Sequence, residues 1–203
     1  MSKIWMVLGA ALMAVGLLGT SPAGAQSAPQ PTPDDRILGK PDAPITIFEY
    51  ASLTCPHCAE FDRETLPKLK ESWIDTGKAR LIFRDFPLDG TALKAAILAR
   101  CSPPSEFYSF IDVLFRSQQS WAVSSDLNAA LEKIAKLGGL SDETFNACMK
   151  NDDLQKQIVA ERYQAEKQYG VDSTPTFFIN GVKFVGAQPF SEFDKALQAA
   201  SKS

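Results

Sequence analysis

The 203-residue sequence predicts an α/β fold in which a long, purely helical segment divides the β-structure. Three observations lead to this class. β-rich segments occur only before residue 90 and after residue 170. Residues 90–169 show helical periodicity. Two cysteines three positions apart, in TCPHC (54–58), stand where the first β-rich segment gives way to a helical pattern.

Composition excludes some classes of function. The chain is 45% hydrophobic and 22% charged, which is ordinary for a globular protein, and its length suits one domain that carries an insertion. The net charge is −3 and the sequence contains no Lys/Arg run or basic stripe, so we do not expect binding to nucleic acid.

The first 25 residues resemble a targeting segment rather than part of the fold. MSK gives a positive start, 16 apolar residues follow, and Ala23 and Ala25 form an A-x-A cleavage pattern. The apolar run is short for a spanning helix, which needs about 20 residues. We predict a cleaved secretory signal peptide (1–25), with an uncleaved anchor as the alternative, and a flexible proline-rich linker (26–36). Export would place the protein where disulfides persist.

The first half of the β-structure holds two predicted strands with a helix between them. PITIFEY (44–50) is typical of a buried strand and ARLIFRDF (79–86) of a second one. Between them, apolar side chains recur at helical spacing up to Gly77, the expected stop: Cys58, Phe61, Thr65, Leu69 and Trp73. Pro67 should kink this helix because it lacks a backbone donor.

Residues 90–169 predict helices only. Apolar stripes run over 93–101, 107–114, 127–137 and 154–169, and Ser141 is expected to cap one further helix. Gly138-Gly139 and Gly170 are the expected helix ends. Beyond them, TFFI and VKFV flank Asn180-Gly181, a strong hairpin signal, and Ser191 is expected to cap a last helix.

The position of the CxxC has chemical consequences. The first N–H groups of a helix lack intrahelical partners, and the helix dipole places partial positive charge there. A thiolate at this end is stabilised, so the pKa of Cys55 should fall. Cys55 is the candidate nucleophile, and Cys58, one turn further on the apolar stripe, is the candidate resolving cysteine. Pro56 suits the first helical position, and a charged His57 would add a positive neighbour. Stabilising the thiolate stabilises the reduced form, which makes the disulfide more oxidising.

Two other interpretations of the CxxC are weaker. A zinc site needs about four nitrogen or sulfur ligands, usually as two close pairs, whereas Cys101 and Cys148 are isolated and the only histidine lies inside the first pair. A structural staple that closes so short a loop constrains the unfolded chain little.

CPHC at a strand–helix junction, the helical block, and STPTFFING from Ser173 together resemble the DsbA-like thiol:disulfide oxidoreductases. The resemblance spans roughly residues 37–200, and it is greatest to the branch whose opening reads LGKPDAPITIFEYASLTCPHC. It implies a thioredoxin fold with an inserted α-helical domain. The boundaries are then 37–89 for the first thioredoxin-like part, 90–169 for the insertion and 170–203 for the second part.

The resemblance also implies roles for three further residues. Thr174 and Pro175 would form a cis peptide that faces the CxxC and exposes the Thr174 backbone to a substrate strand, with an ordinary trans proline as the alternative. Thr174 departs from the valine common here in DsbA proteins and matches the isomerase pattern. Glu49 would move protons to and from the buried cysteine; alternatively it is an acid paired with Arg84.

The remaining two cysteines fall in the helical block. If Cys55 pairs with Cys58, only one intramolecular partner remains for Cys101 and for Cys148. We predict a structural disulfide between them. Two unpaired buried cysteines, or a second redox couple, are the alternatives.

The resulting functional hypothesis is a periplasmic thiol:disulfide oxidoreductase, active as a monomer, that donates disulfides to unfolded exported polypeptides with cysteines. A DsbB-type membrane oxidase that passes electrons to quinone would reoxidise it, and no metal or organic cofactor is required. A disulfide isomerase or reductase on the same fold is the main alternative. A binding module with a spare bridge and a metal carrier are the others.

Overall fold

The computed structural model describes residues 27–202, and the predicted signal peptide lies outside these described residues. One sheet of order β1-β3-β2-β4-β5 forms the centre of the molecule. Its strands are β1 (Ile37–Gly39), β2 (Ile45–Ala51), β3 (Ala79–Asp85), β4 (Thr176–Ile179) and β5 (Val182–Val185). β2 is parallel to β3 and antiparallel to β4, so the strand that precedes the CxxC lies in the middle of the sheet.

The helical run behind the CxxC changes its hydrogen-bond pattern along its length. It comprises α1 (Pro56–Glu60), η1 (Phe61–Thr65), α2 (Leu66–Leu69) and η2 (Lys70–Ile74), and both η1 and η2 are π-helical. Pro67 lies in the short α-helical stretch between the two π-turns. The predicted helix is confirmed, and π-turns on both sides accompany the proline that lacks a donor.

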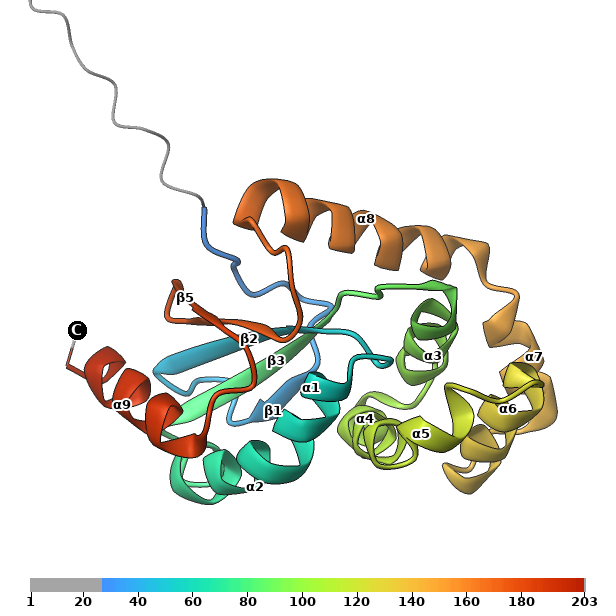
Figure 1. Cartoon of the computed structure of the whole chain (residues 1–203), viewed down its shortest axis with the longest axis horizontal. Coiled ribbons are helices and arrows are strands. Elements are labelled where there is room, and N and C mark those ends of the chain that lie inside the picture. Colours follow the sequence, from blue (N-terminus) through green and yellow to red (C-terminus); the bar gives the residue numbers. More distant parts are fainter. Residues whose placement is uncertain (1–26, 203) are drawn as a thin grey trace, which may run out of the picture.

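The two faces of the sheet carry separate apolar clusters. Ile45, Ile47 and Ala51 of β2 pack with residues of the CxxC helix and of α9 (Phe190–Ala200) on one face. Phe48 and Tyr50 lie on the other face, with residues of α8 (Asp152–Tyr169). Figure 1 shows α1, α2 and α9 on one side of the sheet and α8 across the other. Because strand side chains alternate, Glu49 shares the face of Ile47 and of the CxxC.

Residues 90–169 form helices and no strand, as expected. They are α3 (Gly90–Arg100), η3 (Pro104–Glu106), α4 (Phe107–Arg116), α5 (Gln118–Trp121), α6 (Leu127–Leu137), α7 (Asp142–Met149) and α8. The Ser141 hydroxyl accepts a hydrogen bond from Thr144 N, and Gly170 closes α8 with φ of 64°, so both predicted caps are confirmed. Leu137, expected on the apolar stripe of α6, is 84% exposed and lies outside the core.

The C-terminal hairpin follows the predicted turn chemistry, whereas the last helix does not. Asn180 and Gly181 take φ of 45° and 88°, the positive values that a two-residue hairpin turn requires. The prediction that Ser191 caps the last helix is wrong. α9 begins one residue earlier, at Phe190, and the N-cap residue is Pro189 in extended conformation, with no side-chain cap.

The segment before β1 is docked against the sheet rather than separate from it. The Arg84 Nε atom lies 2.6 Å from Asp35 Oδ1, and a second Arg84 nitrogen donates to the Gln30 carbonyl. The Tyr108 hydroxyl donates to the Arg36 carbonyl at 2.8 Å. These contacts hold residues 27–36, which composition alone assigned to a flexible linker, and they position β1, a three-residue strand that the sequence did not reveal.

Within residues 27–202, no helix combines the length and the apolar character that crossing a bilayer requires.

Cys101 and Cys148 form a disulfide that joins the end of α3 to α7 across a sequence separation of 47 residues. In the chain-entropy model, opening a loop of this length costs roughly 4 kcal/mol as an upper value. We expect the Cys101→Ala/Cys148→Ala variant to lose up to about 4 kcal/mol of unfolding free energy in urea. The Cys55→Ala/Cys58→Ala variant is the control. Equal losses in the two variants would show that the bridge has no special structural role.

Candidate active site

Cys55 is the residue that caps the CxxC helix. It has extended backbone angles (φ −79°, ψ 120°), and Pro56 begins α1 directly after it. The loop before it is held by the Ser52 hydroxyl, which accepts from Thr54 N and Leu88 N at 3.4 and 3.3 Å. The Sγ atom of Cys55 is therefore fixed at the end of the helix where N–H groups lack intrahelical partners.

The segment before β4 completes the site from the other end of the chain. The Thr174–Pro175 peptide is cis, and the Cys55 thiol donates to the Thr174 carbonyl oxygen at 3.3 Å. The Thr174 hydroxyl oxygen is buried and has no hydrogen-bond partner among residues 27–202. Pairing of β2 with β4 brings these residues together although 119 positions separate them in the sequence.

The two sulfur atoms have opposite acidities. The pKa of Cys55 falls from its ordinary value near 9 to about 5, because the Cys58 thiol, the Thr174 side chain and the backbone N–H groups of Cys58 and His57 donate to its sulfur, against the effect of burial. The pKa of Cys58 is raised, chiefly by burial and also by the hydrogen bond to Cys55 and the charge of Glu49. Cys55 is 6% exposed and Cys58 is completely buried, so only Cys55 is accessible to a substrate.

His57 points away from the reacting sulfurs. Its side chain is 73% exposed, and its Nδ1 lies 3.2 Å from Glu60 Oε2. Its backbone N–H, rather than a charged ring, is the group that acts on Cys55. Across residues 27–202, no group of three or more His, Cys, Asp or Glu side chains is placed to hold a metal ion.

Glu49 lies beneath the CxxC helix. It is 2% exposed, its Oε1 has no partner within the described part of the chain, and burial and the charge of Asp62 raise its pKa well above the ordinary value. The alternative that pairs it with Arg84 is wrong, because Arg84 binds Asp35 through two hydrogen bonds of 2.6 and 2.8 Å. Glu49 is therefore a neutral carboxyl group at neutral pH, within electrostatic reach of Cys58.

Sequence reasoning missed Gln118, at the start of α5. Its side-chain nitrogen donates to the carbonyl oxygens of Leu53 and Cys55 at 2.8 and 3.0 Å, and the side chain is buried. Through these bonds the helical block holds the backbone of the nucleophile's loop. Nothing in the motif SQQSW distinguishes this glutamine from its exposed neighbour Gln119.

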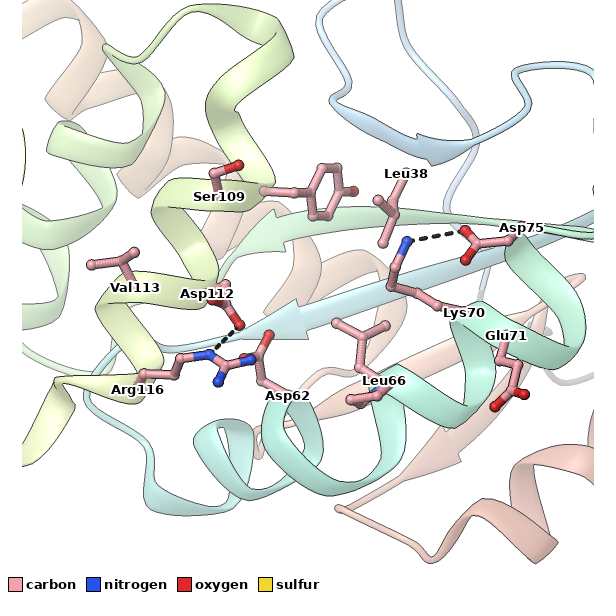
Figure 2. Close-up of a pocket in the computed structure, with 12 residues that line it drawn as sticks. Leu38, Asp62, Leu66, Lys70, Glu71, Asp75, Ser109, Asp112, Val113 and Arg116 are labelled. Carbon is pink, nitrogen blue, oxygen red and sulfur yellow. Dashed lines mark hydrogen bonds and ion pairs between the residues drawn. The ribbon is translucent and has the colours of Figure 1, made fainter. Parts of the chain in front are cut away.

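Asp62, one turn beyond Cys58, was missed for the same reason. It is 6% exposed, and burial together with the charge of Asp112 raises its pKa to about 7, although Arg116 and Arg63 act in the opposite direction. It lines a groove of about 580 Å³ between the CxxC helix and α4 (Figure 2).

Comparison with known proteins identifies the family. A family model described as Thioredoxin matches residues 31–199. The crystal structure of α-DsbA1 from Wolbachia pipientis is 39% identical, with a TM-score of 0.79, and the match covers 85% of this chain and 94% of that one. The chain belongs to the DsbA-like thiol:disulfide oxidoreductase family.

Two sequence relatives are also similar to this DsbA-like chain. A Rickettsia bellii protein, whose name assigns it provisionally to the protein-disulfide oxidoreductases, is 36% identical over 151 residues. These residues are 74% of this chain and 58% of the relative, so the chain spans less than two thirds of the relative's length. Disulfide bond formation protein D of Bacillus subtilis is 25% identical over 82% of this chain and 75% of its own length.

The role of Gln118 in this DsbA-like site can be tested with a matched pair of variants. Gln118→Met keeps the side-chain length but leaves the Leu53 carbonyl without this donor, so we expect a loss of about 1–2 kcal/mol in unfolding free energy. We also expect slower formation of the mixed disulfide at Cys55, measured by stopped flow. Gln119→Met is the control. If both variants react at the wild-type rate, Gln118 does not position the nucleophile.

Proposed function

We propose that the protein is a periplasmic disulfide donor that oxidises exported polypeptides through the Cys55–Cys58 pair. The observation that carries the proposal is the acidity of Cys55, whose pKa of about 5 leaves its sulfur ionised at neutral pH. A stabilised thiolate favours the reduced pair. The disulfide of the same pair is then readily reduced by substrate, which is the property of an oxidant.

The asymmetry of the two sulfurs assigns their roles. A substrate thiolate attacks Cys55 Sγ, the Cys55–Cys58 bond breaks, and its electron pair passes to Cys58 Sγ, which takes up a proton. A second substrate thiolate then attacks the substrate sulfur of the mixed disulfide and expels Cys55 as a thiolate. The substrate leaves oxidised, and the pair remains as the Cys55 thiolate and the Cys58 thiol. The burial of Cys58 protects it from attack by substrate.

Thr174 and Pro175 are the proposed substrate-binding residues. The Thr174 carbonyl lies 3.3 Å from Cys55 Sγ, so a polypeptide aligned along this segment would present a cysteine beside the nucleophile. Backbone pairing of this kind is independent of side chains, which suits an enzyme that acts on many unfolded chains. The Thr174 hydroxyl, which has no partner within residues 27–202, is available to donate to the thiolate.

Glu49 is the proposed proton relay for Cys58. Both groups face the same side of β2, both are buried, and each influences the titration of its surroundings: the charge of Glu49 raises the pKa of Cys58. A neutral carboxyl group can supply the proton that Cys58 needs when it leaves as a thiolate. Pro56 and His57 complete the proposed site as the first helical residue and as a backbone donor.

The cellular setting is part of the proposal. A signal peptide at 1–25 would deliver the chain to the periplasm, where disulfides persist. A DsbB-type membrane oxidase linked to quinone is the proposed electron acceptor. The proposed organisation is a thioredoxin-like domain (37–89 and 170–203) with a helical insertion (90–169), acting as a monomer.

The oxidant assignment predicts the outcome of equilibration with glutathione buffers. We expect a reduction potential above about −180 mV, the value typical of protein disulfide isomerase. The measurement uses the Cys101→Ala/Cys148→Ala variant, so that only the CxxC titrates, with Cys55→Ser as a blank. A potential near −270 mV, typical of thioredoxin, would assign the protein to the reductants instead.

A second assay separates the oxidase from the isomerase. The oxidised protein should rapidly introduce disulfides into reduced ribonuclease and should reshuffle scrambled ribonuclease poorly. The reverse order of activities, efficient reshuffling with weak oxidation, would favour the isomerase that Thr174 brings to mind.

A further inference from the structure

We propose that Asp62 is the second member of the proton relay and connects Glu49 to the water of the groove between the CxxC helix and α4. The inference deepens the proposed function and rests on it, because it needs Cys58 to exchange a proton in each cycle. Cys58 is completely buried and Glu49 is 2% exposed, so neither can exchange that proton with bulk water directly.

The position of Asp62 on the helix places it between the two regions. It follows Cys58 by four residues in one continuous helical run, so both side chains lie on the same side of the helix. Its Oδ2 is buried and has no hydrogen-bond partner among residues 27–202, and the same holds for Glu49 Oε1. Two buried carboxyl groups with unpaired oxygens are costly unless they serve a purpose. The charge of Asp62 acts on Glu49, so the two are electrostatically coupled.

The groove provides access to solvent. Its charged lining consists of Asp62, Lys70, Glu71, Asp75, Asp112 and Arg116. Lys70 binds Asp75 at 3.0 Å and Arg116 binds Asp112 at 2.7 Å. Figure 2 shows the Asp62 carboxylate beside the Arg116 guanidinium, at the end of the groove nearest the CxxC helix. Asp62 is thus at the boundary between the buried acid and the charged wall.

The charges around Asp62 set its proton affinity near neutrality. Burial and Asp112 on α4 favour its protonated form, whereas Arg116 on α4 and Arg63 on its own helix favour the anion. Behind it, Glu49 on β2 is the remaining acid, and the nearby Tyr108 hydroxyl is held neutral by burial. A group balanced in this way can both accept and release a proton at physiological pH.

The proton balance of the step is simple. During reoxidation the Cys55 thiolate attacks an external disulfide, and Cys58 must then lose its proton to attack the mixed disulfide. Glu49 takes that proton on one oxygen while its own proton passes from the other oxygen to the Asp62 carboxylate. Asp62 releases the proton to water in the groove. The same protons move in the opposite direction when substrate reduces the pair.

The test is single-turnover oxidation of the reduced full-length protein by oxidised glutathione. The first phase, formation of the mixed disulfide at Cys55, depends on glutathione concentration, whereas the second phase, attack by Cys58, does not. We expect Asp62→Asn to slow the second phase at least about tenfold at pH 7.5, to leave the first phase unchanged, and to remove an inflection near pH 7 from the second-phase profile. Asp62→Glu should restore both, and exposed Glu64→Gln is the matched control.

Two further variants make the result decisive. Glu49→Gln/Asp62→Asn should be no slower than Glu49→Gln alone, because the two acids act in series. Asp112→Asn should move the second-phase inflection to lower pH, because Asp112 raises the pKa of Asp62. A wild-type second phase in Asp62→Asn, with the reduction potential and the Cys55 acidity also unchanged, would refute the outlet and leave the proposed function standing. A changed potential or Cys55 acidity in that variant would instead assign Asp62 a role in tuning the nucleophile.

Discussion

The thiolate of Cys55 at the N-terminus of α1 is the interaction on which the rest of the site depends. Backbone N–H groups of His57 and Cys58 point at its sulfur, and their donation outweighs the effect of burial. This needs a helix that begins at residue 56, and Pro56 defines that start. It also needs Thr174, delivered to the same sulfur by the pairing of β2 with β4. The central strands of the sheet therefore serve to bring a helix end and a cis-proline segment together.

The difference between the two cysteines makes the pair useful. Three residues separate an accessible sulfur that carries charge from a buried sulfur that does not, and a helix supplies both environments within one turn. The same burial that keeps Cys58 neutral cuts it off from water, so its proton requires a path. Glu49 and Asp62, two buried acids with unpaired oxygens, are the groups along which such a path can run.

Local patterns in the sequence predicted much of this arrangement. The CxxC helix, the helical block, the hairpin at Asn180-Gly181 and the caps at Ser141 and Gly170 all follow from spacing and residue type. The parts that were missed depend on contacts between distant segments. Gln118 reaches Leu53 over 65 positions, and Arg84 prefers Asp35, 49 positions away, to the nearby Glu49. Ser191 failed as a cap because the helix starts one residue earlier, after Pro189, and such boundaries are rarely fixed by one residue.

The account stands on the charge of one sulfur atom, which absorbs ultraviolet light near 240 nm only as an anion. The most direct test is therefore to titrate the reduced Cys101→Ala/Cys148→Ala protein and to follow the thiolate absorbance from pH 3 to pH 10. The account predicts a transition of one thiol with a midpoint near pH 5, absent from Cys55→Ser. A single midpoint near 9, as for an unperturbed cysteine, would contradict it, because the disulfide would then lack the driving force that makes it a donor.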